Sequence, residues 1–322
     1  MTTPDPVVVI TGASSGIGRA TAQEYARRGA RLVLASRNED SLETVADECR
    51  ALGAEVRVIP ADVSQQPDMH ALAVGAVAEF GRIDVWVGNA GVFAYGSFEQ
   101  LSEAVFRQVI ETNLMGQVHG ARAVLPFFRM QGSGTLVLVG SLYSRVSSPM
   151  VSPYVASKFG ALGFAESLRA ELRGSGIRLR VVLPATIDTP IYQNAANVTG
   201  RHVHPLPPAS SPKRVARAIV RAPGRRRPVV FVGRVQTWTL LPHRVSPGLY
   251  DAATALAKDK IELREPGAEM TVGTVFEPPP TAGGVNGGWR SVGARMGLVA
   301  GVTAIVAGLV ALGRLASRTG QR

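Results

Sequence analysis

The first 190 residues alternate between short segments rich in Val, Ile and Leu and longer helical patterns. Such short apolar segments are typical of strands that are buried on both faces of a parallel sheet. Strand, helix and strand in this order imply right-handed crossovers, so the pattern predicts an α/β fold with a doubly wound parallel sheet. We expect seven strands, at residues 7–10, 31–36, 55–63, 84–91, 134–141, 177–185 and 228–233.

The pattern changes after residue 235, which divides the 322-residue chain into an α/β domain (1–235) and C-terminal additions. Residues 236–276 are apolar but interrupted by proline, and we expect a helical extension of one or two short helices over the sheet edge. Residues 277–295 begin with EPPPTAGGVNGG. This composition predicts a flexible linker.

Residues 296–313 form an uncharged segment, MGLVAGVTAIVAGLVALG, with arginines on both sides. As a helix it would be about 27 Å long, close to the thickness of a bilayer core. We therefore expect a transmembrane or membrane-associated helix that anchors a cytoplasmic catalytic domain. The alternative is a terminal helix buried against the domain.

The ends and the cysteine content agree with a cytoplasmic domain. The N-terminus has no basic region followed by a long apolar segment, so it does not resemble a signal peptide. The single cysteine, Cys49, cannot form an internal disulfide, which favours a reducing compartment or a chain that is indifferent to redox conditions.

The net charge of +11 is concentrated in residues 213–234, which hold eight basic and no acidic side chains. This segment lacks interleaved aromatic residues, so we do not expect nucleic acid as a partner. The alternatives are a solvated helix face and a patch that meets anionic lipid. His202 and His204 lack a third ligand at a suitable spacing, so we expect no metal site.

The sequence TGASSGIG at residues 11–18 follows the first predicted strand and opens the first helix. Its glycines permit a tight turn and a close approach of the backbone to a ligand, and the helix N-terminus presents N–H groups to a pyrophosphate. This context predicts the dinucleotide site of a Rossmann fold. The candidate cofactor-binding residues here are Gly12, Ser14, Ser15, Gly16, Ile17 and Gly18.

The end of the second predicted strand bears on the choice of dinucleotide. An acidic residue at this place binds the adenosine ribose in NAD sites, whereas this chain has Ser36 followed by Arg37. A guanidinium can bind a 2′-phosphate that a carboxylate would repel. We therefore expect NADP(H) in preference to NAD(H), the alternative being that Arg37 is a solvated surface residue.

Several motifs in a fixed order resemble the short-chain dehydrogenase/reductase (SDR) family, over about residues 5–235. They are TGASSGIG, Asp62-Val63 after the third strand, NAG at 89–91, Asn113 in TNLMG, Ser141, YVASK at 154–158 and PATIDT at 184–189. Two positions depart from the family pattern. Gly88 stands where the family usually has a first asparagine, and Ala185 stands where it usually has glycine.

Tyr154 and Lys158 are four residues apart, so a helix places both side chains on one face. A phenol is a poor base at neutral pH, but a nearby ammonium lowers its pKa. Tyr154 could then exchange a proton with a carbonyl or alcohol oxygen, while Ser141 donates a hydrogen bond to the same oxygen. We expect the nicotinamide to carry the hydride.

The resemblance implies further roles for residues at the matching positions. Asn113 would help to hold a water relay to Lys158, which would also bind the nicotinamide ribose together with Tyr154. The remaining cofactor contacts implied are Asp62 and Val63 near the adenine, Asn89, Ala90 and Gly91 beneath the cofactor, and Pro184, Ile187 and Thr189 at the nicotinamide end. Family members commonly form homodimers or homotetramers.

The sequence thus predicts an NADP(H)-preferring oxidoreductase that interconverts a carbonyl and an alcohol. Residues 190–212 would form a mobile substrate loop, and Phe93, Tyr95 and Leu142 favour a lipophilic small-molecule substrate. One alternative is a non-catalytic dinucleotide-binding sensor or scaffold. A serine hydrolase acting through Ser141 is disfavoured because the nucleophile elbow and a suitable histidine are missing.

Overall fold

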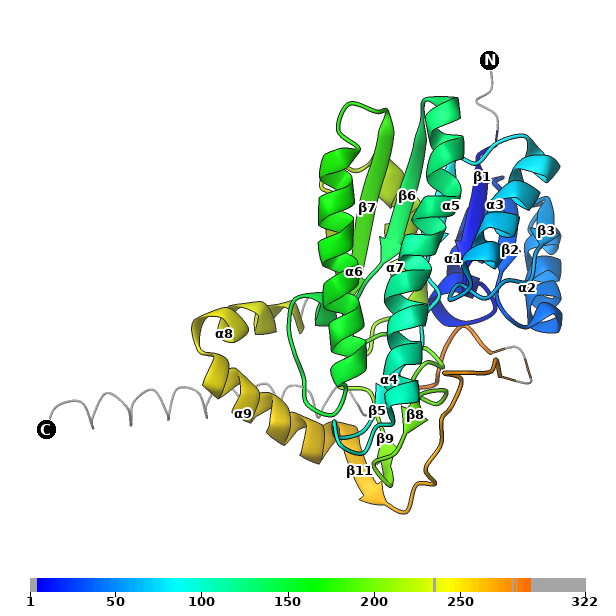
Figure 1. Cartoon of the computed structure of the whole chain (residues 1–322). Coiled ribbons are helices and arrows are strands. Elements are labelled where there is room, and N and C mark those ends of the chain that lie inside the picture. The colour runs from blue at the N-terminus through cyan, green and yellow to red at the C-terminus, as the bar shows by residue number, and fades with distance from the viewer. Residues whose placement is uncertain (1–4, 234–235, 280, 282, 291–322) are drawn as a thin grey trace, which may run out of the picture.

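The computed structural model describes residues 5–233, 236–279, 281 and 283–290. Its centre is a sheet of seven parallel strands in the order β10-β7-β6-β4-β1-β2-β3 (Figure 1). The predicted seven-stranded parallel sheet is therefore confirmed. The strands are β1 (Val7–Thr11), β2 (Arg31–Ala35), β3 (Val56–Val58), β4 (Val85–Gly88), β6 (Gly134–Val139), β7 (Ile177–Pro184) and β10 (Val229–Val232).

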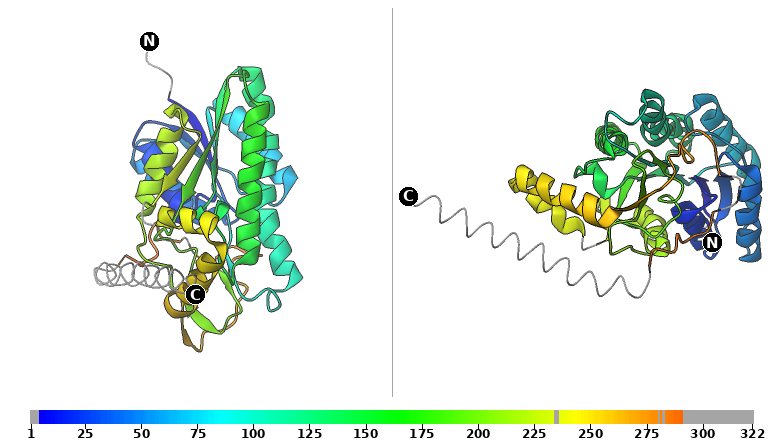
Figure 2. Two further views of the ribbon diagram at one scale, coloured as in Figure 1. Left: turned by 90° about the vertical axis from the view of Figure 1, so that its left-hand side faces the viewer. Right: turned by 90° about the horizontal axis from the view of Figure 1, so that it is seen from below.

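Helices cover both faces of this sheet, and each face has its own apolar core (Figure 2). One core joins the sheet to α1 (Gly16–Ala26), α2 (Glu39–Ala51) and α7 (Pro212–Arg221). The other joins it to α3 (Gln66–Phe80), α5 (Gly116–Gln131) and α6 (Ser152–Glu171). The central strands are fully buried, which explains why β1 reads as an uninterrupted apolar run rather than an alternating one.

Most of the remaining elements lie at the carboxyl ends of the strands. They are the short strands β5 (Ala94–Tyr95), β8 (Ala196–Asn197), β9 (Arg201–Val203) and β11 (Leu263–Pro266), the helices α4 (Glu103–Ile110), α8 (Leu240–Val245) and α9 (Pro247–Ala257), and short 3-10 turns at 142–144 and 236–239. A third 3-10 turn, at 222–224, joins α7 to β10 at the amino ends of the strands. Parallel pairing joins β5 to β8, and antiparallel pairing joins β9 to β11. The C-terminal extension is thus paired with β9, at the carboxyl ends of the parallel strands.

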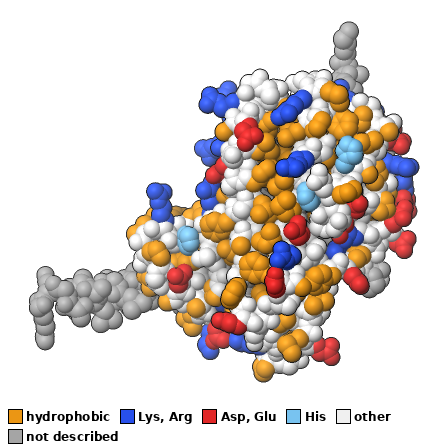
Figure 3. All heavy atoms as spheres, viewed as in Figure 1, with side chains coloured by type: hydrophobic (Ala, Val, Ile, Leu, Met, Phe, Trp, Pro, Cys, Tyr) orange, Lys and Arg blue, Asp and Glu red, His pale blue; other side chains and the backbone are white. Residues whose placement is uncertain are grey.

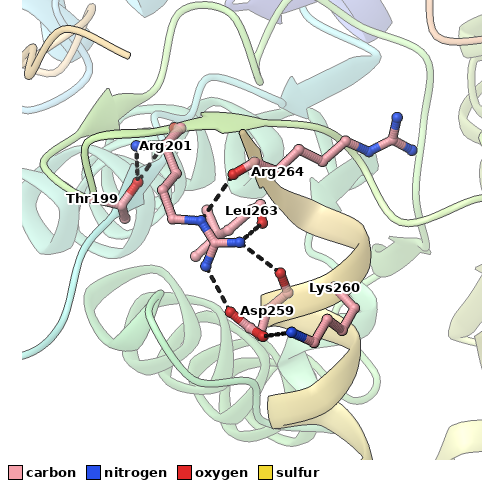
Figure 4. Close-up of polar contacts among 6 residues, drawn as sticks. All are labelled: Thr199, Arg201, Asp259, Lys260, Leu263 and Arg264. Carbon is pink, nitrogen blue, oxygen red and sulfur yellow. Dashed lines mark hydrogen bonds and ion pairs between the residues drawn. The ribbon is translucent and has the colours of Figure 1, made fainter. Parts of the chain in front are cut away.

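Arg201 of β9 binds several residues of the C-terminal extension (Figure 4). Its guanidinium forms an ion pair with the Asp259 carboxylate at 2.7 Å and donates to the backbone carbonyls of Asp259, Leu263 and Arg264. One planar group therefore holds β9, β11 and the π-helical turn at 258–262 together, as the fixed fork of arginine donors allows.

Two predictions concern the C-terminus. In the part of the chain that the structure describes, no helix is long and apolar enough to cross a membrane. The predicted membrane helix at 296–313 lies outside the described residues. By contrast, much of the predicted flexible linker is described, and residues 283–289 are hydrogen-bonded to the α/β domain. Backbone carbonyls and N–H groups hold it, which composition alone did not reveal.

Candidate active site

A cavity of about 300 Å³ opens at the carboxyl ends of the parallel strands, where ligands bind in open α/β sheets. Residues that follow β1, β2, β4, β6 and β7 meet there although they are far apart in the sequence. Of the predicted site residues, Gly18 and Asn113 are not in its wall. The others line it: Gly12, Ser14, Ser15, Gly16, Ile17, Ser36, Arg37, Asp62, Val63, Asn89, Ala90, Gly91, Ser141, Tyr154, Lys158, Pro184, Ile187 and Thr189.

The glycine loop has the conformation that its sequence predicts. Gly12 has a positive φ of 64°, and a Cβ there would lie 2.7 Å from the Cα of Ala90. A Cβ on Gly18 would lie 2.0 Å from the Gly12 carbonyl oxygen, so this glycine permits the close packing of the loop on α1. Ser15, the N-cap of α1, makes no capping bond with its side chain within the described residues. Its hydroxyl and the helix N-terminus fit an anionic group such as a pyrophosphate.

Arg37 lies at the adenosine end of the cavity, but its guanidinium is already hydrogen-bonded. The two terminal nitrogens donate to the backbone carbonyls of Thr274 at 2.7 Å and Phe276 at 2.8 Å. Burial lowers the pKa of this arginine, and the charge of Asp62 opposes that effect. Arg37 is therefore not a solvated surface residue. A 2′-phosphate would have to share the guanidinium with these carbonyls.

The loop at 88–91 is fixed by side chains on both sides. Asn89 donates from its amide to the carbonyls of Thr11 and Gly12, each at 3.1 Å, and so joins the two loops that form the cavity floor. The departure at Gly88 has a steric reason, because a Cβ there would lie 2.1 Å from Oε1 of Gln117. The buried Gln117 amide donates to the Gly88 carbonyl at 3.1 Å.

Asn113 is completely buried in a π-helical turn (Glu111–Met115) between α4 and α5. Such turns are rare and often occur at functional sites. The Asn113 amide accepts from Val92 N at 2.8 Å and donates to Val92 O at 2.9 Å and to the Ser157 hydroxyl at 3.1 Å. Its side chain thus links the backbone of Val92, which lines the cavity, to Ser157 of α6.

Tyr154 lies in the first turn of α6, and its ring packs on Phe93 with the ring centroids 4.0 Å apart. Burial raises the pKa of the Tyr154 phenol to about 12, although a hydrogen bond with Ser141 opposes the increase. We expected the lysine ammonium to lower this pKa, but in the structure burial raises it. Ser141 is held by a reciprocal capping box with Ser144 at the end of β6.

Lys158 follows one turn later on the same helix, with its ammonium 5.4 Å from the centroid of the Tyr154 ring. The ammonium donates to the Val139 carbonyl at 3.3 Å. Burial lowers the pKa of Lys158 to about 8, so the side chain remains mostly charged at pH 7. A Cβ on Gly91 would lie 3.7 Å from this ammonium, so glycine keeps the space beside it open.

The comparisons with known proteins agree with this geometry. The family model described as short chain dehydrogenase matches residues 6–198, which is more than half of the chain. The chain is a short-chain dehydrogenase/reductase. An uncharacterized oxidoreductase of Bacillus subtilis, YxnA, is 35% identical over 233 residues, which are 71% of this chain and 65% of that protein. The 11-beta-hydroxysteroid dehydrogenase 1A of Arabidopsis thaliana is 40% identical over 189 residues, 58% of this chain and 54% of that protein.

Two solved SDR-fold structures extend the likeness to three dimensions. An SDR of Burkholderia phymatum in complex with NAD has a TM-score of 0.70 and 30% identity, and the match covers 77% of this chain and 95% of that one. An alcohol dehydrogenase of Thermococcus sibiricus complexed with 5-hydroxy-NADP has a TM-score of 0.62 and 29% identity, covering 70% and 94%. The matches to YxnA and to the Arabidopsis dehydrogenase each span less than two thirds of those proteins.

The cavity of this SDR also contains a buried ion pair that the sequence did not predict. Lys258 and Glu262 bind each other in the π-helical turn at 258–262, and both line the cavity. The Lys258 ammonium also lies 5.2 Å from the centroid of the Tyr95 ring. The spacing of four residues was the available signal, but the same spacing occurs in many exposed helix pairs.

Aromatic side chains surround this ion pair. Phe93 contacts Tyr95 and Tyr192, with ring centroids 4.7 Å and 6.2 Å apart, and Tyr143 and Tyr250 also line the cavity. Burial is the main reason that the pKa of Tyr95 and the pKa of Tyr192 are raised, so both phenols stay neutral. Phe93 and Tyr95 were predicted from the sequence to lie near the site, whereas Tyr143, Tyr192 and Tyr250 were not.

Proposed function

We propose that this chain is an NADP(H)-preferring oxidoreductase that interconverts a carbonyl and an alcohol on a largely apolar small molecule. The observation that carries the proposal is that Ser141, Tyr154 and Lys158 converge on the cavity that the glycine loop also lines. The family membership supports a dehydrogenase or reductase. The name of the Arabidopsis relative supports a hydroxyl or keto group on an apolar framework as the reacting group.

The chain supplies the proton chemistry. A bound nicotinamide donates or accepts the hydride. With a pKa of about 12, Tyr154 is protonated at neutral pH and can give its proton to a carbonyl oxygen that is being reduced. Ser141 steadies the charge on that oxygen by a hydrogen bond. The Lys158 ammonium stabilises the phenolate that forms when Tyr154 gives up its proton.

Two features support NADP(H) as the preferred cofactor. Ser36 occupies the position at the end of β2 where an acidic residue would favour NAD(H), and Arg37 next to it also lines the cavity. Asp62, Val63 and Ala90 would complete the adenosine end, and Pro184, Ile187 and Thr189 the nicotinamide end. NAD(H) is the alternative cofactor, and the Burkholderia structure in complex with NAD shows that a similar fold can hold it.

The cavity wall favours a substrate with an apolar body and one further polar group. The aromatic rings and Leu206 would contact the apolar body. The Lys258–Glu262 pair offers both a donor and an acceptor to a second hydroxyl or carbonyl. This sharpens the lipophilic substrate expected from the sequence.

Two further parts of the proposal concern assembly and location. Figure 3 shows apolar side chains along α5 and α6. Met130 of α5 and Phe159 of α6 are exposed, and the face formed by these two helices would pair two copies into a homodimer. The membrane anchor at 296–313 stays a prediction from the sequence.

The test is turnover of a panel of ketones by the full chain with NADPH and with NADH, followed at the nicotinamide absorbance. We expect NADPH-dependent reduction of apolar ketones, and loss of it in Tyr154→Phe. The matched control is Tyr250→Phe, which removes another cavity-lining phenol, one that donates to the Ser147 carbonyl at 2.6 Å. Dinucleotide binding without turnover of any ketone, and without oxidation of the matching alcohols, would instead support the sensor or scaffold.

A further inference from the structure

The segment formed by residues 274–279 and 283–289, here called the strap, lies along the dinucleotide side of the cavity (Figure 1, in orange). Its first contacts are at the adenosine end. The carbonyls of Thr274 and Phe276 accept from Arg37, and the Pro279 carbonyl accepts from the Asn38 amide at 3.1 Å. The strap therefore contacts the end of β2, where the ribose specificity of the fold is set.

The strap then crosses the glycine loop. The Gly284 carbonyl accepts from Gly16 N at 3.0 Å, and the Gly283 carbonyl accepts from the Arg19 guanidinium at 2.8 Å. We expected the N–H of Gly16 to serve a pyrophosphate, but in the structure it donates to the strap. The strap thus contacts the first turn of α1, beside the predicted pyrophosphate site.

The last contacts are at the nicotinamide end, beyond β7. The buried Asp188 carboxylate accepts from Gly287 N at 3.0 Å and from Trp289 N at 2.8 Å. The Trp289 indole donates to the Thr189 carbonyl at 3.2 Å. One short segment therefore contacts the parts of the chain that would hold each third of the dinucleotide.

We propose that the strap is the outer wall of the dinucleotide site, and that it must open before a bound dinucleotide can dissociate. Pro278 and Pro279 line the same cavity as Ser36, Asp62 and Val63, and the Pro279 carbonyl binds Asn38 just beyond β2, so they would cover the adenosine end. The cavity keeps a volume of about 300 Å³ with these prolines in its wall, so the strap bounds the cavity without filling it. This inference rests on the dinucleotide site proposed above.

Two glycines of the strap provide a matched pair of variants. A Cβ on Gly287 would lie 2.4 Å from the Thr189 backbone oxygen, so Gly287→Ala must displace the strap. A Cβ on Gly284 would meet only strap atoms, the nearest being the Asn286 carbonyl oxygen at 3.3 Å, so Gly284→Ala makes the same change with little displacement. Thermal melting of both proteins checks that each is folded.

The experiment is a stopped-flow measurement on the full chain, in which NADPH is displaced by excess NADP⁺ and nicotinamide fluorescence reports the dissociation rate. We expect Gly287→Ala to raise that rate by about tenfold, and Gly284→Ala to leave it within about twofold of the wild type, since changes at a binding site act mostly on dissociation. Equal rates of NADPH dissociation in the wild type and both variants would overturn the strap proposal and leave the proposed function in place. Tighter binding by Gly287→Ala would also overturn it, because the strap would then be an inhibitor.

A second measurement needs no variant. Hydrogen exchange of the wild type is compared with and without NADPH, for peptides from the strap and from the glycine loop. We expect both peptides to exchange more slowly in the bound protein. Protection of the glycine loop alone would overturn the strap proposal, while a wild type that binds neither NADPH nor NADH would overturn the proposed function and the strap together.

Discussion

The cofactor side and the substrate side of the cavity are built in different ways. The side proposed for the cofactor, which also holds the proposed catalytic residues, consists of residues that closely follow buried strands, such as Gly12 after β1 and Ser141 two residues after β6. The substrate side consists of short strands and irregular segments, which Arg201 and the Lys258–Glu262 pair hold together. The first side is fixed by the sheet that all members of the fold share. The second depends on a few side chains, so it can change while the chemistry remains.

The largest expected difference between the two sides is in stability, and it should come from the buried ion pair. We predict that Lys258→Met lowers the free energy of unfolding by about 3–5 kcal/mol, because it leaves the Glu262 carboxylate buried without its partner. The double variant Lys258→Met, Glu262→Leu should recover most of that loss. Denaturant unfolding measures both. A single variant as stable as the wild type would mean that the substrate side does not depend on this pair.

A smaller effect, confined to activity, should come from the cofactor side. We predict that Ser141→Ala lowers kcat by about 10²–10³-fold, the usual cost of removing one donor to a developing oxyanion. The control is Ser144→Ala, which removes the other half of the same capping box but not the hydroxyl beside Tyr154. Steady-state kinetics on one ketone decides between them. Equal losses in both variants would show that Ser141 acts only through the local fold.

The smallest effect is the dependence of reduction on pH. The pKa of Lys158 is lowered to about 8, so its ammonium is present below pH 8 and is lost as the pH rises through that value. We predict that kcat/KM for reduction is level near pH 7 and falls above pH 8 by up to about tenfold per unit. Lys158→Arg should keep its charge and lose this decrease. A wild-type profile that stays level to pH 9.5 would contradict the role of Lys158.

The same contrast explains what the sequence could predict. The seven strands and the glycine loop follow from local patterns, since apolar runs and glycine positions act over a few residues. Ser141, Tyr154 and Lys158 could be predicted from the order of the motifs. They line one cavity because a parallel sheet brings the carboxyl ends of its strands together. The cavity contains them all. Their chemical roles remain predictions.

No local sequence pattern or motif of this kind marks the strap or the ion pair. The strap is held mainly by its own carbonyls and N–H groups, which every residue possesses, so a Pro/Gly-rich segment was interpreted as a linker. The environment of Tyr154 also depends on distant residues. The sequence placed an ammonium near the phenol, but only the packed structure shows that burial raises the pKa of that phenol.

The proposed cofactor site is tested most directly by a titration of the full chain with NADPH and then NADH, followed by nicotinamide fluorescence, in the wild type and in Arg37→Leu. We predict saturable binding of both dinucleotides by the wild type, with NADPH bound more tightly. In Arg37→Leu that preference should be lost while NADH binding persists. If the wild type bound neither dinucleotide, the cavity at the strand ends would not be a cofactor site, and the proposed oxidoreductase activity would be contradicted.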